Sequence, residues 1–195
     1  MKSRRLDPSR TTPDMYRLLE RIPPKKTELV WLSFDVYTLL ERCKSRFPEL
    51  ADRHVDIWFG PQETLACIQH DDMHQRILIH SVLNHPDVPQ EVIEFIIIHE
   101  LIHLVVPGRV IEGKLKQHPP EFWKKEQEMA ENRQISWSWT FIALSQLYRK
   151  DEEGEGLIIP RSWKRMAPKR YPSLENIKQL DPDFDKMLNE AEGLI

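Results

Sequence analysis

Apolar residues are densest between Pro89 and Val106, where they recur at almost every position and predict a buried helix. The preceding residues are typical of a helix start, with Asp87 as the cap, Gln90 closing a capping box and a proline in the first turn. Pro107-Gly108 predicts the stop. The helix would have about five turns. Because its apolar residues occupy nearly every face, it should lie at the centre of its domain.

Alternating apolar and polar positions predict a small sheet ahead of this helix. Residues 55–59 are expected to form a strand, and residues 64–70 and 76–80 a hairpin around a turn at 71–74. Two helices are expected closer to the N-terminus. The first would run from a cap at Asp14 to Arg21, and the second from a cap at Ser33 to about Phe47.

Beyond the central segment, a long helix is predicted from Pro119 toward Lys150. Its later part, residues 135–144, is too apolar to be left in water and should pack on the N-terminal helices or form an oligomer interface. The oligomeric state itself stays open. We therefore expect a flexible tail at 1–13, a folded domain at 14–150, and an extension at 151–195 with an acidic linker followed by basic and aromatic residues.

The central helix carries the pentapeptide His99-Glu100-Leu101-Ile102-His103, which has H-E-x-x-H spacing. Residues four apart share a helix face, so His99 and His103 can bind one metal ion. Glu100 projects about 100° away around the axis, where it can reach a metal-bound water without being a ligand. Otherwise these buried polar groups would need hydrogen bonds to neighbouring backbone. A metal site is the interpretation that we prefer.

A catalytic zinc ion usually has three protein ligands and one open position. His118 is our candidate for the third ligand, because the two following prolines predict a helix start that would hold its imidazole rigidly. Three carboxylates are alternatives, since other zinc proteases take a glutamate from a later helix: Glu112, Glu121 and Glu126. Four further histidines have irregular spacing and are interpreted as solvated or hydrogen-bonded rather than as a second metal site: His70, His74, His80 and His85.

Three segments together resemble the SprT-like (Spartan-type and YgjP-like) zinc metalloproteases. They are residues 76–83, residues 89–104 and His118-Pro119-Pro120-Glu121-Phe122-Trp123. The resemblance implies an α+β, zincin-like domain in which a small, mostly antiparallel sheet packs on the central HExxH helix with flanking helices. It also implies an edge strand beside that helix, here residues 64–70, whose unpaired backbone groups bind an extended substrate. The cysteine-rich zinc ribbon of many SprT-like proteins has no counterpart in this sequence.

The expected function is zinc-dependent hydrolysis of peptide bonds in a protein substrate. Glu100 would act as general base on a zinc-activated water and then deliver the proton to the leaving amine. Three residues could by type stabilise the oxyanion, and nothing in the sequence selects among them: Tyr148, Arg161 and Tyr171. Two alternatives stay open, a zinc-binding regulatory or interaction module that cleaves nothing and a zinc hydrolase of a non-peptide amide.

Composition limits the possible partners and the compartment. The formal net charge of −3 gives no general attraction to nucleic acid or to an anionic membrane. Cys43 and Cys67 lack the spacing of a zinc ribbon and are expected to be free thiols. No apolar run approaches the length of a membrane span, and the N-terminus lacks the apolar core of a signal peptide, so a cytoplasmic protein is expected.

One segment of the extension could contact nucleic acid. Between Arg161 and Tyr171 the chain interleaves five cations with two aromatic residues, a composition that can follow a phosphate backbone and stack on bases. Such a segment is more often a solvated basic stretch that folds over its own domain. Since the overall charge is negative, we expect no stable complex with nucleic acid.

Overall fold

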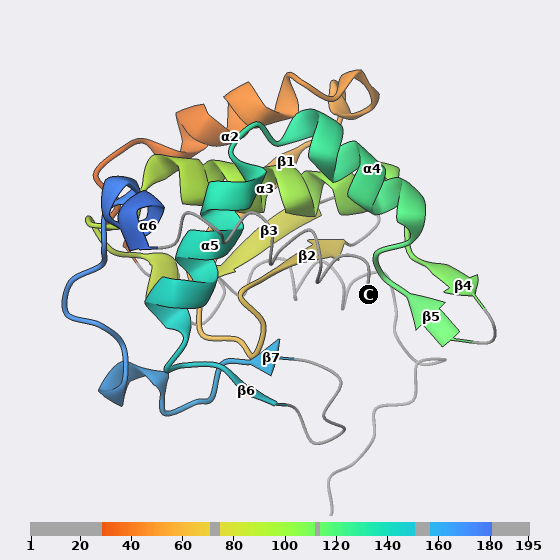
Figure 1. The fold of residues 1–195 in the computed structure, drawn as a ribbon. Coiled ribbons are helices and arrows are strands. Elements are labelled where there is room, and N and C mark those ends of the chain that lie inside the picture. The colour runs from red at the N-terminus through yellow and green to blue at the C-terminus, as the bar shows by residue number, and fades with distance from the viewer. Residues whose placement is uncertain (1–28, 71–74, 112–113, 151–156, 181–195) are drawn as a thin grey trace, which may run out of the picture.

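The computed structural model describes residues 29–70, 75–111, 114–150 and 157–180 as an α+β fold (Figure 1). Its helices are α2 (Val36–Lys44), α3 (Gln90–Val105), α4 (Pro120–Met129), α5 (Arg133–Leu144) and α6 (Leu174–Leu180). Short 3-10 helices are η2 (Pro48–Leu50), η3 (Ser81–Leu83) and η4 (Trp163–Arg165). The strands are β1 (Val55–Gly60), β2 (Ala66–His70), β3 (Gln75–His80), β4 (Arg109–Ile111), β5 (Lys114–Lys116), β6 (Arg149–Lys150) and β7 (Leu157–Ile158).

The main sheet has the strand order β1-β3-β2, so β2 is at an edge. β2 and β3 are antiparallel, which confirms the predicted hairpin, while its turn at 71–74 lies outside the described residues. β1 confirms the predicted strand and runs parallel to β3. The pairs β4–β5 and β6–β7 are antiparallel and were not predicted from the pattern. Parallel pairing is therefore confined to β1 and β3 among the described strands.

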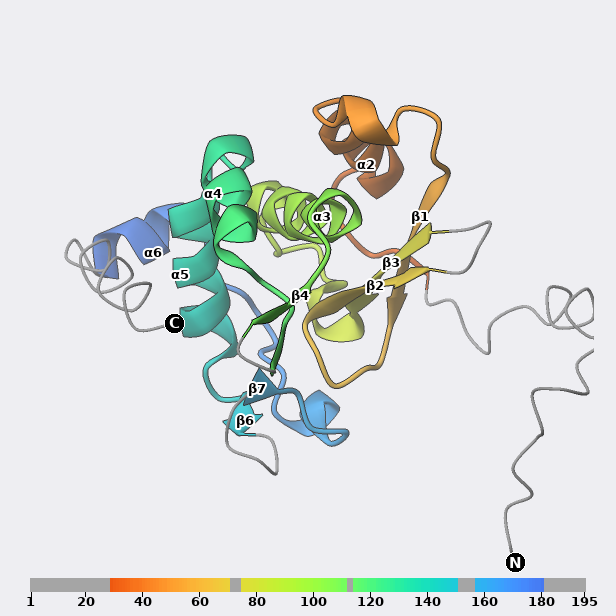
Figure 2. The same cartoon turned by 90° about the vertical axis from the view of Figure 1, so that its right-hand side faces the viewer.

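Helix α3 forms the centre of the core, as its apolar pattern predicts. Ile93, Ile97 and Leu101 are completely buried, and the strand residues Ile57 and Ile77 belong to the same cluster. Figure 2 shows the sheet on one side of α3 and the helices α4 and α5 on the other. A helix enclosed from both sides has no polar face, which explains why its apolar residues lack a 3.6-residue period.

Two predicted helix caps are wrong. Pro89 occupies the cap position of α3 without a side-chain hydrogen bond, whereas an oxygen of Asp87 lies 3.4 Å from the backbone nitrogen of Tyr171. Asp35, rather than Ser33, caps α2 by accepting a hydrogen bond of 2.9 Å from the backbone N–H of Tyr37. The Asp87 carboxylate lies beside the backbone of Tyr171 instead of capping α3. At α2 the neighbouring carboxylate of Asp35 is the cap instead of the Ser33 hydroxyl. The helix predicted at 14–21 lies outside the described residues.

The long helix predicted after Pro119 is broken in two. Helix α4 ends at Met129 and α5 begins at Arg133, so the chain changes direction between them. Helix α5 packs mainly on α3 and α6, whereas the N-terminal helix α2 packs mainly on α3. Because the chain turns at this break, Arg133 at the start of α5 reaches back to form an ion pair with Glu126 on α4.

Residues 157–180 of the predicted extension pack on the body of the fold. Ile159, Tyr171 and Ile177 are buried in the same cluster as α3. The Tyr171 hydroxyl donates a 2.7 Å hydrogen bond to the carbonyl of Val82, and the Trp139 indole N–H donates one of 2.8 Å to the carbonyl of Pro172. These contacts tie the C-terminal segment to η3 and to α5.

Candidate metal centre

Three imidazoles converge where the C-terminal half of α3 meets the start of α4. The Nε2 atom of His118 lies 3.2 Å from Nε2 of His99 and 3.1 Å from Nε2 of His103. Tetrahedral zinc with nitrogen ligands at about 2.0–2.1 Å requires nitrogen atoms about 3.3 Å apart, close to these separations. Among the described residues, these three histidines are the group whose ligand atoms could hold a metal ion. The donor set and its spacing therefore fit Zn²⁺.

The position of His118 depends on the hairpin formed by β4 and β5, which connects it to His103. At the base of this hairpin, a Cβ atom on Gly108 would lie 3.0 Å from the backbone carbonyl oxygen of Lys116. Such a contact would be tighter than most Cβ contacts in proteins, so glycine suits the close approach of the two segments. Pro120 then begins α4 in the first-turn position where proline is favoured, so His118 is held at a helix entrance as predicted.

Two of the alternative carboxylate ligands, Glu126 and Glu121, form other interactions in the structure. Glu126 is fully buried, and its Oε1 lies 2.6 Å from Nδ1 of His99, on the side of the ring opposite to Nε2. Its second oxygen accepts a 2.6 Å hydrogen bond from Nε of Arg133. Glu121 is exposed and pairs with Arg109 at 2.8 Å. Glu112 lies outside the described residues.

Glu126 is therefore placed to orient a ligand rather than to be one. If Nε2 binds a metal, Nδ1 of His99 carries the proton and its N–H donates a hydrogen bond to the Glu126 carboxylate. Burial alone would raise the pKa of Glu126, but the hydrogen bond from His99 and the Arg133 guanidinium lower it below its usual value. The charged carboxylate in turn makes the His99 imidazole a stronger ligand.

Phe122 supports all three imidazoles from one side. Its ring centroid lies 4.9 Å from that of His99 and 4.6 Å from those of His103 and His118, and the side chain is 0% exposed. Neither this contact nor the role of Glu126 emerged from the sequence. The sequence does place Phe122 and Glu126 four and eight positions after His118, a spacing that puts both residues on one face of α4.

Glu100 lies against the edge strand. It is buried on α3, and its carboxylate accepts a hydrogen bond from the backbone N–H of Ile68 on β2. Burial raises the pKa of Glu100 to about 7, and the charge on His99 and the Ile68 hydrogen bond oppose that shift. A carboxyl group that titrates near neutral pH can both accept and release a proton there. The position of β2 at the edge beside α3 is as predicted.

His118 also has a shifted pKa. Burial, assisted by the charge on His99, lowers the pKa of His118 to about 4, although Glu126 opposes this shift. The imidazole is thus neutral at neutral pH, which is the form that binds metal.

The remaining histidines that the structure describes take part in local hydrogen bonds. Nδ1 of His80 accepts the backbone N–H of Val82 at 3.0 Å, and Nδ1 of His85 accepts that of Asp87 at 3.1 Å. Burial lowers the pKa of His80 to about 4. The side chain of His70 and the whole of His74 lie outside the described part of the chain.

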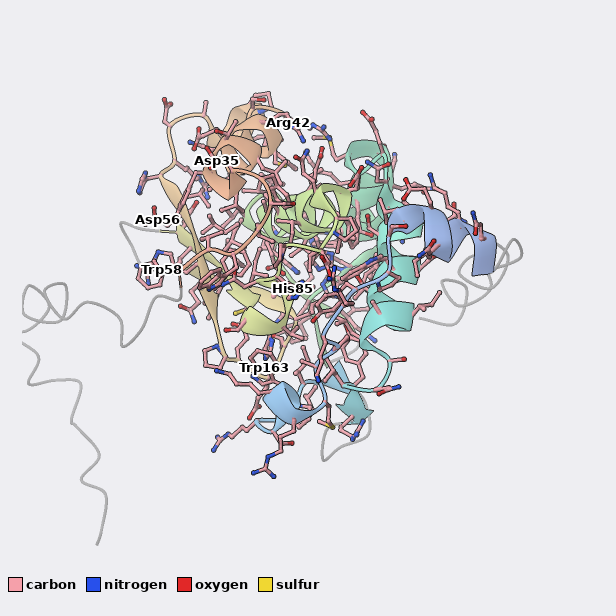
Figure 3. All side chains as sticks on the ribbon, turned by 90° about the vertical axis from the view of Figure 1, so that its left-hand side faces the viewer. Asp35, Arg42, Asp56, Trp58, His85 and Trp163 are labelled. Atoms are coloured by element: carbon pink, nitrogen blue, oxygen red, sulfur yellow. The ribbon has the colours of Figure 1, made fainter. Side chains whose placement is uncertain are left out.

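The two aromatic residues of the basic stretch, Trp163 and Tyr171, pack against other residues of the fold. Trp163 contacts the ring of His80 at 4.9 Å, and Tyr171 is buried with its ring stacked on Trp139. Figure 3 shows Trp163 at the lower end of the molecule. The five cations are all exposed: Arg161, Lys164, Arg165, Lys169 and Arg170. Tyr171 is therefore not available to stack on a base, and its hydroxyl is committed to Val82.

The other candidates for an oxyanion donor are not distinguished by the structure. Burial raises the pKa of Tyr148, whose ring faces Phe141 at 6.3 Å, and Arg161 is exposed on the loop before η4. Cys43 and Cys67 are free thiols, as expected.

Comparison with known protein families, curated proteins and solved structures gives no match to this chain. The resemblance to SprT-like proteases therefore rests on the motif residues themselves. Among the described helices, none is long and apolar enough to cross a membrane.

Proposed function

We propose that this protein is a zinc-dependent metallopeptidase of the SprT-like type, which hydrolyses peptide bonds in a protein substrate. The observation that carries the proposal is the convergence of His99, His103 and His118 with a buried Glu100 next to them. Three imidazoles leave one position of a tetrahedral metal open, which is the arrangement of catalytic rather than structural zinc.

The bound metal would supply a Lewis acid that polarises the peptide carbonyl and acidifies a water molecule. Glu100 accepts the proton of that water during attack on the carbonyl carbon and passes it to the nitrogen of the leaving amine. Burial raises the pKa of Glu100 in the metal-free protein, whereas a bound cation would favour its ionised form, which is the form that accepts a proton. Glu126 holds His99 in orientation throughout.

The edge strand supports a peptide as the substrate. Among the described strands, β2 pairs with β3 alone, so its other edge can accept the main chain of an extended segment. Ile68 on this strand is hydrogen-bonded to Glu100, which brings the free edge next to the catalytic carboxylate. An extended chain paired with β2 would pass the metal centre with its backbone exposed to attack.

The test compares zinc-loaded parent protein with Glu100→Gln, using an unstructured protein such as casein as the substrate. The amide has nearly the size of the carboxylate but cannot take up the proton, so cleavage should fall by about 10²–10⁴-fold. Zinc content should be unchanged. Glu128→Gln, the same replacement at an exposed position of α4, is the matched control and should cleave like the parent.

The outcomes also separate the alternatives. Equal cleavage by parent and Glu100→Gln would remove Glu100 as the base and contradict the proposal. A zinc-loaded parent that cleaves no protein or peptide would point to a regulatory module or to a hydrolase of a non-peptide amide.

A further inference from the structure

The β4–β5 hairpin, which connects His103 to His118, exposes an apolar face. Val110 and Leu115 are directly paired across the two strands, and their side chains are 71% and 60% exposed. Paired residues of an antiparallel ladder lie on the same face, so the two side chains form one small apolar surface. Figure 1 shows the hairpin beyond the C-terminal end of α3, at the right of the view.

The hairpin is fixed relative to the metal ligands. It begins six residues after His103 and ends two residues before His118. Its base is closed by the tight approach of Gly108 to Lys116, and Arg109 ties β4 to α4 through a 2.8 Å ion pair with Glu121. A two-stranded hairpin alone is only marginally stable in water, and these attachments hold it in place.

The composition of the hairpin does not favour its own stability. Arg109 and Lys116 are also directly paired, and like charges opposite each other destabilise a ladder. The Val110–Leu115 pair gains little from burial, since both side chains face solvent. Features that weaken an element locally are expected where it binds something.

The size and charge of this surface indicate its occupant. A stable protein–protein interface takes about 20–30 residues from each partner, many more than two apolar side chains provide. A single bulky side chain of an extended polypeptide fits the surface, and the adjacent Arg109–Lys116 pair disfavours a basic segment. The hairpin is attached in sequence to both His103 and His118, so a polypeptide that reaches the metal centre has the hairpin as a neighbouring element of the chain.

We propose that Val110 and Leu115 form a specificity surface that receives a bulky apolar side chain of the polypeptide, so that the protein selects unfolded, apolar segments. This inference rests on the peptidase function proposed above. Apolar side chains of this size are mostly buried in folded proteins and become accessible on unfolding. Native surfaces would therefore be poor substrates.

The experiment measures binding separately from cleavage. Zinc-loaded Glu100→Gln is titrated, by fluorescence anisotropy, with two labelled peptides that differ only in a central leucine or serine. The same titrations are made with Val110→Ser and Leu115→Ser added together. The control adds Leu29→Ser and Val30→Ser, which make the same chemical change at exposed positions of the N-terminal segment.

The leucine peptide should bind more tightly than the serine peptide, and the hairpin variant should weaken its binding by about 5–10-fold. The serine peptide should bind both proteins equally, and the control variant should bind like the Glu100→Gln protein. Equal affinity for the two peptides, or a hairpin variant that retains the preference for leucine, would overturn the inference.

Cleavage of the two peptides is then measured with the parent protein, in which Glu100 is intact, and with the same hairpin and control substitutions made in that protein. A parent that binds the leucine peptide selectively but does not hydrolyse it would contradict the peptidase function and leave the binding surface supported. Equal rates of hydrolysis of the two peptides by the parent, with no change in the hairpin variant, would support the peptidase function. The same result would contradict the proposal that Val110 and Leu115 determine specificity.

Discussion

Nδ1 of His99 lies 2.6 Å from Oε1 of Glu126, and this contact joins the three-histidine cluster to the helix that follows it. Glu126 is in turn held by Arg133 across the break between α4 and α5. The orientation of one candidate ligand, His99, is therefore tied to an ion pair between α4 and α5.

The purified protein should contain close to one zinc ion per chain, and His118→Ala should lose most of it. Removing one of three imidazoles leaves a site with two protein ligands, which is too few for stable binding. Elemental analysis measures the zinc content. Glu121→Ala is the control, because its carboxylate is exposed and paired with Arg109. Loss of zinc in that variant and not in His118→Ala would show that the third ligand is the glutamate.

Glu126→Gln should lower zinc affinity by about 10–100-fold without removing any ligand. The amide cannot carry the charge that strengthens the His99 imidazole, although it can still accept a hydrogen bond from Nδ1. Competition with a chromophoric chelator gives the dissociation constant. Glu128→Gln on the exposed side of the same helix should bind zinc like the parent. Equal affinities of the two variants would mean that Glu126 has no such role.

Phe122→Leu should destabilise the protein by about 1–3 kcal/mol, because it removes part of a fully buried ring. Zinc affinity should fall as well, since all three imidazoles rest on this ring. Urea unfolding of the zinc-free protein and chelator competition measure the two effects separately. Phe141→Leu, at a position 37% exposed, should change both quantities much less.

Gly108→Ala should weaken zinc binding, although position 108 is not a ligand. Its new Cβ would lie 3.0 Å from the backbone oxygen of Lys116, so this backbone must move by a few tenths of an ångström, and we expect the shift to reach His118. Gly60→Ala is the matched control, because its Cβ would meet only the Leu78 side chain at an ordinary 3.4 Å. If the two variants bind zinc equally well, the hairpin base does not position His118.

Single-stranded oligonucleotide at micromolar concentration should form no stable complex at moderate salt. Tyr171 is buried and Trp163 contacts His80, so base stacking should add little to the phosphate contacts of the exposed cations. A fluorescence titration at two salt concentrations measures this. Binding that persists at moderate salt and disappears when the five cations between Arg161 and Arg170 are replaced by alanine would contradict the expectation.

The elements of the candidate site that could be predicted are those determined by short-range spacing. The i, i+4 pair His99 and His103, the hairpin with its edge strand at β2, and the proline-led start of α4 after His118 all follow local rules. The buried position of α3 also followed from its uninterrupted apolar composition.

What could not be predicted depends on contacts between distant segments. Asp87 fits the local pattern of a helix cap, but its carboxylate lies beside the backbone of Tyr171, 84 residues away. The helix after Pro119 has no proline or glycine to end it near Met129. Glu126 could be read as a ligand or as its support, and only its position on the Nδ1 side of His99 distinguishes the two.

The hydrogen bond from Trp139 to the carbonyl of Pro172 joins α5 to the C-terminal segment, so truncation of that segment should affect α5. A fragment that stops at Lys150 would leave a fully buried indole without its acceptor and uncover the face of α5 that α6 now covers. Helix α5 carries Arg133, so disorder there would reach His99 through Glu126. We therefore expect a fragment to keep the three-histidine cluster intact only if it extends through α6.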